Sequence, residues 1–275
     1  AVQGNSRTRI AYVRQVDPFG KTKQICVADS DGRNEIVLTG DGELTATPAW
    51  GKFGGELYYT TYKDHNPDLA GVILATRQSW WISRRTGFNL SPAWNPVRER
   101  IALTLTKDGN SELYTIARDG SDLQRLTNNR AIDSSPTWSP DGRQIAFTSD
   151  RTGSPQIWIK DLGTGEERRL TYHSTYNDGA SWAPAGPERI AFCSRVDGYF
   201  QIFVCNVDGS NLQQLTHGNH NNEDPCWSPN GLELMFTSDR TGRKQIYRMF
   251  GDGSNVNQIT EGTACQSVAW SPVLP

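Results

Sequence analysis

The chain has 275 residues and a formal net charge of −2, so it is long enough for a sizeable core and lacks the basic excess of a nucleic-acid-binding protein. No apolar run approaches the roughly 18 residues of a membrane-spanning helix. The 26 Gly and 14 Pro are spread evenly, which indicates many tight turns, and the nine Trp, nine Tyr and nine Phe favour strands over helices.

The chain opens with three expected strands, at residues 9–13, 24–28 and 35–39. A tryptophan in a fixed setting follows them and recurs at spacings of 44, 44, 44, 45 and 43 residues. The recurring residues are Trp50, Trp94, Trp138, Trp182, Trp227 and Trp270. A period of about 40–50 residues is typical of repeat architectures, among them the β-propeller.

Each period contains four short strands separated by turn residues. In the fourth unit the expected strands are residues 135–139, 144–149, 156–160 and 168–171. Ser139-Pro140-Asp141-Gly142 closes the first hairpin, because Pro presets one backbone angle of the turn and Gly accepts a positive φ. A solenoid of such units would need distinct capping repeats, and none is visible, so the pattern favours a propeller.

The second unit is less regular than the others. Its expected strands are residues 56–61, 72–76 and 79–83. Trp80 and Trp81 lie outside the repeating tryptophans, and we weigh packing against exposure for them, with packing favoured.

The two chain ends complement each other, because the chain begins with a second strand and ends with a lone first strand at residues 267–271. The sequence therefore predicts a single all-β domain, residues 1–275, that is a six-bladed β-propeller. Each blade has four antiparallel strands, and the C-terminal strand joins the N-terminal blade, which removes an exposed edge. The expected blades are residues 9–39 with 267–272, then 47–85, 91–127, 135–171, 179–216 and 224–260.

The repeat resembles the propeller of the TolB family, the periplasmic component of the Tol–Pal envelope system. The resemblance rests on Ser91-Pro92-Ala93-Trp94-Asn95-Pro96, on residues 136–142 (PTWSPDG), on residues 145–150 (IAFTSD) and on the C-terminal Ala269-Trp270-Ser271-Pro272. It covers essentially the whole chain. It implies a periplasmic location and a protein partner, the lipoprotein Pal, bound on the face that carries the loops between blades.

The repeat assigns each loop to one of two faces. Loops between blades share a face with the loops that join second to third strands. The inter-blade loops are residues 39–46, 84–90, 128–134, 172–178, 217–223 and 261–266. His65, His173, His217 and His220 all map to this face. Because rigid scaffolds carry function on variable loops, we expect the partner to bind here. The predicted contacts are Phe88, Asn89, Asp133, Ser134, His173, Tyr176, His217 and Asn219.

Three sets of residues have competing interpretations. Acidic residues end several inter-blade loops, and they could line a Ca²⁺ site or simply cap strands and turns: Asp133, Asp178, Glu223 and Asp224. The repeating tryptophans could stack sugars, but their fixed position favours packing between blades. The five cysteines have no C-x-x-C spacing, and most are expected to be small buried residues on strands.

No nucleophile elbow, zincin motif or phosphate-binding loop is present in the sequence. The leading hypothesis is therefore a non-catalytic, monomeric scaffold that binds a Pal-like lipoprotein, with no cofactor, no metal and no nucleic acid. The alternative is a propeller enzyme or enzyme accessory. It could be a metal-assisted hydrolase or lyase using His173, His217 and His220, or a gating propeller that belongs to a peptidase.

Overall fold

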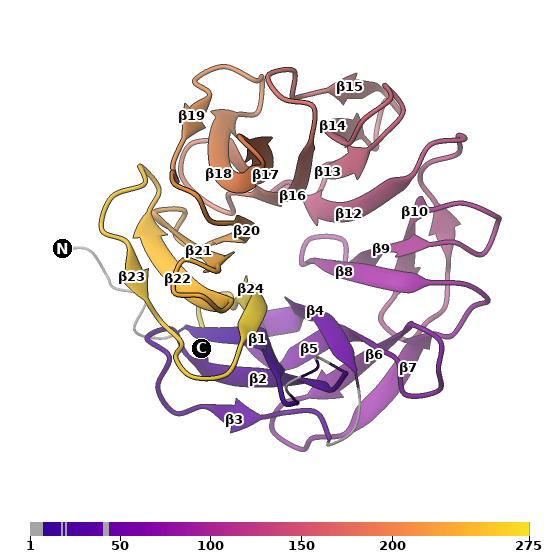
Figure 1. The fold of residues 1–275 in the computed structure, drawn as a ribbon. Helices are drawn as coiled ribbons and strands as arrows, with labels where there is room; N and C mark the ends of the chain where they lie inside the picture. The colour runs from indigo at the N-terminus through magenta and orange to yellow at the C-terminus, as the bar shows by residue number, and fades with distance from the viewer. Residues whose placement is uncertain (1–7, 18, 20, 41–43, 275) are drawn as a thin grey trace.

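The computed structural model describes residues 8–17, 19, 21–40 and 44–274. Six four-stranded antiparallel sheets form a ring around a central channel, which confirms the predicted six-bladed β-propeller (Figure 1). We number the blades 1 to 6 from the blade that contains both chain ends. Their innermost strands are, in that order, β24 (Cys265–Trp270), β4 (Thr45–Trp50), β8 (Asn89–Asn95), β12 (Asp133–Trp138), β16 (Asn177–Trp182) and β20 (Asn222–Trp227). A single 3₁₀ turn, η1 (Lys52–Gly54), follows β4.

The remaining strands step outward from the channel in each blade. The second strands are β1 (Arg9–Gln15), β5 (Glu56–Thr61), β9 (Arg100–Leu105), β13 (Gln144–Ser149), β17 (Arg189–Val196) and β21 (Glu233–Ser238). The third strands are β2 (Lys23–Asp29), β6 (Asp68–Ile73), β10 (Glu112–Ala117), β14 (Gln156–Asp161), β18 (Tyr199–Asn206) and β22 (Gln245–Phe250). The outermost strands are β3 (Ile36–Val37), β7 (Ser79–Ser83), β11 (Gln124–Arg125), β15 (Glu167–Arg169), β19 (Gln213–Gln214) and β23 (Asn257–Gln258).

The ring closes where both ends of the chain meet in one blade. β24 pairs antiparallel with β1, with Ile10 opposite Trp270 and Ala11 opposite Ala269. Backbone and side-chain hydrogen bonds between Arg9 and Ser271, both 2.9 Å, extend the pairing beyond the strand. The prediction that the C-terminal strand completes the N-terminal blade is confirmed.

The second strands are buried on both sides, because each blade packs against a neighbour on each face. β13 and β21 have five buried residues out of six. Sheets covered on both faces read as nearly continuous apolar runs instead of alternating patterns. This explains why residues 145–147 (Ile-Ala-Phe) are all buried.

The innermost strands begin two residues earlier than the sequence indicates, because each contains a β-bulge. In β12 the pairing runs through Asp133 and Ser134, shifts register, and resumes at Thr137. The third residue of every innermost strand has a positive φ, between 47° and 65°. These residues are Thr47, Ser91, Ser135, Gly179, Asp224 and Ser267. A bulge leaves one residue unpaired, and the expected strands start at that residue.

The repeating tryptophans pack between blades, as predicted. Trp138 is buried with Ala102 and Leu113 of the preceding blade and with Phe147 of its own. Its indole Nε1 donates a hydrogen bond of 3.0 Å to the carbonyl of Ala93, also in the preceding blade. The sugar-stacking alternative is therefore not supported by the burial of these rings.

The cysteines also follow the expectation. All five lie on strands as free thiols, and four of them are buried. In the described part of the chain, no helix is long and apolar enough to cross a membrane.

Candidate functional site

One face of the ring carries the loops between blades together with the loops that join second to third strands. We call it the loop face, and we call the opposite face, formed by the other two hairpin turns of each blade, the turn face. Hydrogen bonds from inter-blade loops to the ends of the strands that flank a second-to-third loop, β17 and β18, show that the two kinds of loop share a face. The carbonyl of Tyr176 accepts a hydrogen bond of 3.1 Å from the backbone of Arg195, and Asn221 Oδ1 accepts one of 3.1 Å from Phe200. The four histidines all lie in these loops.

Buried amides fix the base of the inter-blade loops. Gln156 Oε1 accepts hydrogen bonds of 2.9 Å from both Thr171 Oγ1 and Asn177 Nδ2. Gln201 Oε1 accepts the equivalent bonds, 2.8 Å from Thr216 and 2.9 Å from Asn222. Each network joins the third strand of one blade to the first strand of the next. The loops above it therefore start from a base that is held by buried hydrogen bonds.

The first pair of predicted contacts divides into one exposed and one buried residue. Phe88 is 53 % exposed, and its backbone N–H is held by Thr106 Oγ1 at 2.8 Å. Asn89 is completely buried; its Oδ1 accepts from Ser83 Oγ at 2.6 Å, and its Nδ2 donates to the carbonyl of Arg85 at 2.9 Å. The prediction that Asn89 contacts a partner is wrong, because its side chain is used to shape the loop that presents Phe88.

The second pair divides in the same way. Asp133 is completely buried, and its Oδ2 accepts from Arg151 at 2.8 Å and from Asn129 Nδ2 at 2.7 Å. A partner cannot reach this carboxylate directly, so its predicted role as a contact is also wrong. Ser134, the next residue of β12, is partly exposed.

His173 and Tyr176 are anchored by aromatic packing at their bases. The His173 ring lies 4.8 Å from Phe203 and 5.7 Å from Phe192, and its Nε2 is 3.2 Å from Ser194 Oγ. Although part of its surface is exposed, burial against these rings lowers the pKa of the His173 imidazole. Tyr176 packs edge-on against Phe200 at 5.3 Å, and burial raises the pKa of its hydroxyl.

The loop between blades 5 and 6 supplies the last two predicted contacts. His217 and Asn219 are both exposed, whereas His220 is half-buried. Burial, followed by the charge of Arg240, lowers the pKa of His220. Within the described residues, no three or more His, Cys, Asp or Glu side chains are grouped so that they could hold a metal ion. His173, His217 and His220 therefore do not form the ligand set that the hydrolase or lyase alternative requires.

The acidic residues at the channel are occupied by internal contacts. Asp178 accepts from Thr148 Oγ1 at 2.6 Å, and Glu223 pairs with Lys244 at 2.6 Å. Asp224 Oδ2 accepts hydrogen bonds of 3.4 Å from Thr237 and 3.3 Å from Ser267, and desolvation, followed by the negative charge of Glu223, raises the pKa of this carboxyl. These contacts favour the capping interpretation over a Ca²⁺ ring.

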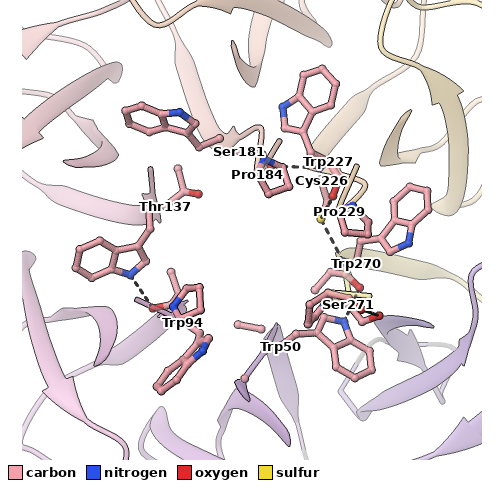
Figure 2. A pocket seen from close by; sticks show the side chains of 18 of the residues that line it. Trp50, Trp94, Thr137, Ser181, Pro184, Cys226, Trp227, Pro229, Trp270 and Ser271 are labelled. Atoms are coloured by element: carbon pink, nitrogen blue, oxygen red, sulfur yellow. Dashed lines mark hydrogen bonds between the residues drawn. The ribbon is translucent and has the colours of Figure 1, made fainter. Parts of the chain in front are cut away.

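Towards the turn face, the channel widens into a cavity of about 740 Å³. Its wall is formed by the ends of the innermost strands, and the indoles point away from its centre into the blade walls (Figure 2). The lining consists mainly of Pro, Ala and Trp, with polar side chains from Thr137, Ser139, Ser181, Cys226 and Ser271 and charged ones from Lys52 and Glu99. No histidine is among the described lining residues, so the cavity offers no general base of that kind.

The turn face differs from expectation in one respect. Its Asp-Gly turns are occupied, as expected, because Asp119, Asp208 and Asp252 each accept bonds from the serine two residues later. However, the turns between first and second strands also expose apolar side chains, and Phe53 is 72 % exposed. Apolar exposure alone therefore does not distinguish the two faces.

Arginines stacked on aromatic rings are the polar feature of the loop face that the sequence reasoning missed. Arg151 lies 4.6 Å from the ring of Trp158, and Arg240 lies 4.5 Å from the ring of Tyr247. Both occur in the heptapeptide Phe-Thr-Ser-Asp-Arg-Thr-Gly, at residues 147–153 and 236–242. This identical repeat is visible in the sequence, but it does not indicate that its arginines stack on aromatic rings.

Comparison with known proteins agrees with this architecture. A family model described as the TolB beta propeller domain matches residues 1–202 and 181–273. The crystal structure of TolB from Acinetobacter baumannii superposes with a TM-score of 0.89 and 27 % identity, covering 98 % of this chain and 68 % of that one. An oligogalacturonate lyase from Vibrio parahaemolyticus shares the fold alone, at 13 % identity and a TM-score of 0.60.

Curated relatives match over shorter segments. The Tol-Pal system protein TolB of Histophilus somni (strain 2336) is 33 % identical over 69 residues, which are 25 % of this chain and 16 % of that protein. The protein of the same name from Bordetella avium (strain 197N) is 36 % identical over 88 residues, which are 32 % of this chain and 19 % of that protein. Since the family model covers nearly the whole chain, the chain belongs to the TolB β-propeller family.

Proposed function

We propose that this protein is a non-catalytic scaffold of the bacterial periplasm that binds a lipoprotein such as Pal through its loop face and so contributes to envelope integrity. Membership of the TolB propeller family and the relatives named as Tol-Pal system proteins support this proposal. The partner and the location are inferred from the family.

The observation that carries the proposal is the construction of the loop face. Exposed aromatic residues, Phe88 at 53 % and Tyr172 at 71 %, stand on loops whose bases are fixed by buried hydrogen bonds. Aromatic residues that project from a rigid surface are favoured as interface hot spots, and a rigid loop loses little entropy on binding. The side chains of the Asp-Gly turns on the turn face are already bonded within their own turns.

We propose as contacts those of the predicted residues that are at least partly exposed. These are Phe88, Ser134, His173, Tyr176, His217 and Asn219. They come from four successive inter-blade loops, between blades 2 and 6, so they are spread in an arc along the loop face (Figure 1). Asn89 and Asp133 act beneath this arc as supports.

We also propose that the protein acts as a monomer. Five of the six outermost strands have only two or three residues, which leaves short edges for another chain to pair with. Short edge strands are a common device against edge-to-edge association.

The experiment is a titration calorimetry comparison with the soluble domain of the Pal-like lipoprotein. One variant replaces Phe88, His217 and Asn219 with Ala, since all three are exposed and their loss leaves the core intact. The matched variant replaces Asp119, Asp208 and Asp252 on the turn face with Ala. We expect the first variant to bind at least about tenfold more weakly, because hot-spot losses exceed about 1 kcal/mol each, and the second to bind normally.

Two results would contradict the proposal at different levels. If the turn-face variant loses binding and the loop-face variant keeps it, the assignment of the face is wrong. If the parent protein does not bind the lipoprotein at all, the partner is wrong. His173 and Tyr176 are left out of this variant because their packing against Phe203 and Phe200 would confuse lost binding with lost stability.

A further inference from the structure

The same heptapeptide occupies equivalent positions in blades 4 and 6, but its arginine is paired with carboxylates only in blade 4. In both copies the arginine lies over two aromatic rings, and its Nε donates to the serine two residues before it, at 2.9 Å for Arg151 and 3.0 Å for Arg240. The two guanidinium groups therefore have the same orientation relative to their blades.

In blade 4 the guanidinium is neutralised by two carboxylates. Arg151 Nη2 bonds Asp133 at 2.8 Å, and Nη1 bonds Glu167 of the outermost strand. Glu167 also bonds Lys160 at 2.7 Å. The cation is fully paired within its own blade.

In blade 6 both carboxylates are replaced. Asn222 stands where blade 4 has Asp133, since each pairs with the serine of its heptapeptide, and its Oδ1 accepts from Arg240 Nη2 at 2.8 Å. Continuing the strand register from Tyr247 and Gln258 puts Val256 in the place of Glu167. No carboxylate among the described residues pairs with Arg240, and its Nη1 has no hydrogen-bond partner among them.

The charged residues next to Arg240 are bonded to other groups. Both carboxylate oxygens of Asp239 bond Asn221, at 2.7 and 2.9 Å, and Lys244 is paired with Glu223 at 2.6 Å. Val256 is 40 % exposed and Arg240 is half-buried, so solvent reaches both side chains. Burial without a counter-charge also lowers the pKa of Arg240.

We propose that Arg240 is an anion subsite of the loop face that binds one carboxylate from an acidic side chain of the docking partner. Blade 4 provides the template for this ligand, because the same guanidinium there holds a glutamate in the space that blade 6 leaves open. A planar carboxylate matches the two-pronged geometry of a guanidinium. The inference rests on the proposed function only for the macromolecule that supplies the carboxylate.

The first experiment tests the unpaired cation without any partner. Val256→Glu rebuilds the blade 4 arrangement inside blade 6, so we expect its urea midpoint to rise. Arg151→Gln leaves the buried carboxylate of Asp133 without its cation and should lower the midpoint clearly. Arg240→Gln loses ring contacts and hydrogen bonds but leaves no carboxylate unpaired, so it should lower the midpoint less. The inference is overturned if Val256→Glu lowers the midpoint, or if the two arginine variants lose equal stability.

The second experiment tests binding directly with a blocked glutamate, N-acetyl-glutamate α-amide, and with the neutral glutamine analogue. The readout is the NMR signal of the Arg240 Nε–H, assigned by its loss in Arg240→Gln. We expect a saturable shift with the glutamate compound alone, and no shift in Val256→Glu, whose own carboxylate occupies the subsite. Equal responses to both compounds, or none to either, would overturn the inference.

The third experiment uses the soluble domain of the lipoprotein and separates the two proposals. If the parent protein binds it, Arg240→Gln and Val256→Glu should each weaken binding about tenfold, the loss of one charge-assisted hydrogen-bonded contact. Normal binding by both variants would refute the subsite while leaving the docking proposal intact. If the parent does not bind but the glutamate compound shifts the Arg240 signal, the subsite stands and the docking partner is wrong.

Discussion

Replacing single tryptophans of the repeat with phenylalanine should separate the contribution of packing from that of the indole hydrogen bond. Trp138 and Trp182 occupy equivalent, buried positions in adjacent blades. Trp138 Nε1 donates to the carbonyl of Ala93 at 3.0 Å, whereas Trp182 Nε1 is buried without a partner among the described residues. The two substitutions therefore remove similar packing but different polar interactions.

The structure gives the expected size of the difference. Trp138→Phe loses a hydrogen bond worth about 1 kcal/mol, and the carbonyl of Ala93 can regain water because Ala93 lines the channel cavity. Trp182→Phe instead removes an unsatisfied buried donor, which had cost about 1–3 kcal/mol. We therefore expect Trp138→Phe to destabilise the fold by about 2 kcal/mol more than Trp182→Phe does.

Equilibrium urea unfolding followed by far-ultraviolet circular dichroism measures this difference. Each variant keeps eight of the nine tryptophans, so intrinsic fluorescence can serve as a second probe. Coincident transitions from the two probes would justify a two-state analysis of this closed ring. Equal destabilisation, or a larger loss for Trp182→Phe, would refute the reasoning.

Two further predictions concern closure of the ring and ionisation in the channel. Deletion of residues 265–275 removes β24 and exposes β1, so we expect aggregation or loss of cooperative unfolding, and a soluble product with an unchanged melting temperature would contradict closure at this point. A carboxyl whose pKa is raised by folding destabilises the fold once it ionises, and this effect is absent below its unfolded pKa of about 3.9. Asp224→Asn should therefore raise the free energy of unfolding near about pH 7 and lose this advantage as the pH falls through about 4, whereas a pH-independent difference would show that Asp224 is not responsible.

Much of the architecture could be predicted from the repeat, because the repeat reflects local turn chemistry and the fixed packing position of its tryptophan. The spacing of the tryptophans gave the number of blades, and the complementary ends gave the closure, since only one arrangement completes the first blade. The first residue of each innermost strand could not be predicted, because a β-bulge interrupts the strand. Ser135 has a positive φ of 54°, and nothing in Asp133-Ser134 signals that pairing continues on its other side.

The candidate site was only partly predictable. Loop membership correctly placed Phe88 and His217 at the surface, but it could not separate them from Asn89 and Asp133, which lie in the same predicted loops. Burial of these two depends on partners distant in the sequence, such as Ser83 and Arg151, whose approach is decided by the packing of neighbouring strands.

The sequence by itself therefore determined the repeat, the number of blades, the turns and the face on which each loop lies, because all of these follow from local conformation and period. Only the tertiary structure decided which polar residues are supports and which are surface. It also decided that Arg151 is paired while Arg240, in the identical heptapeptide, is not. The difference arises because charge pairing depends on residues contributed by other strands, and a local sequence carries no information about them.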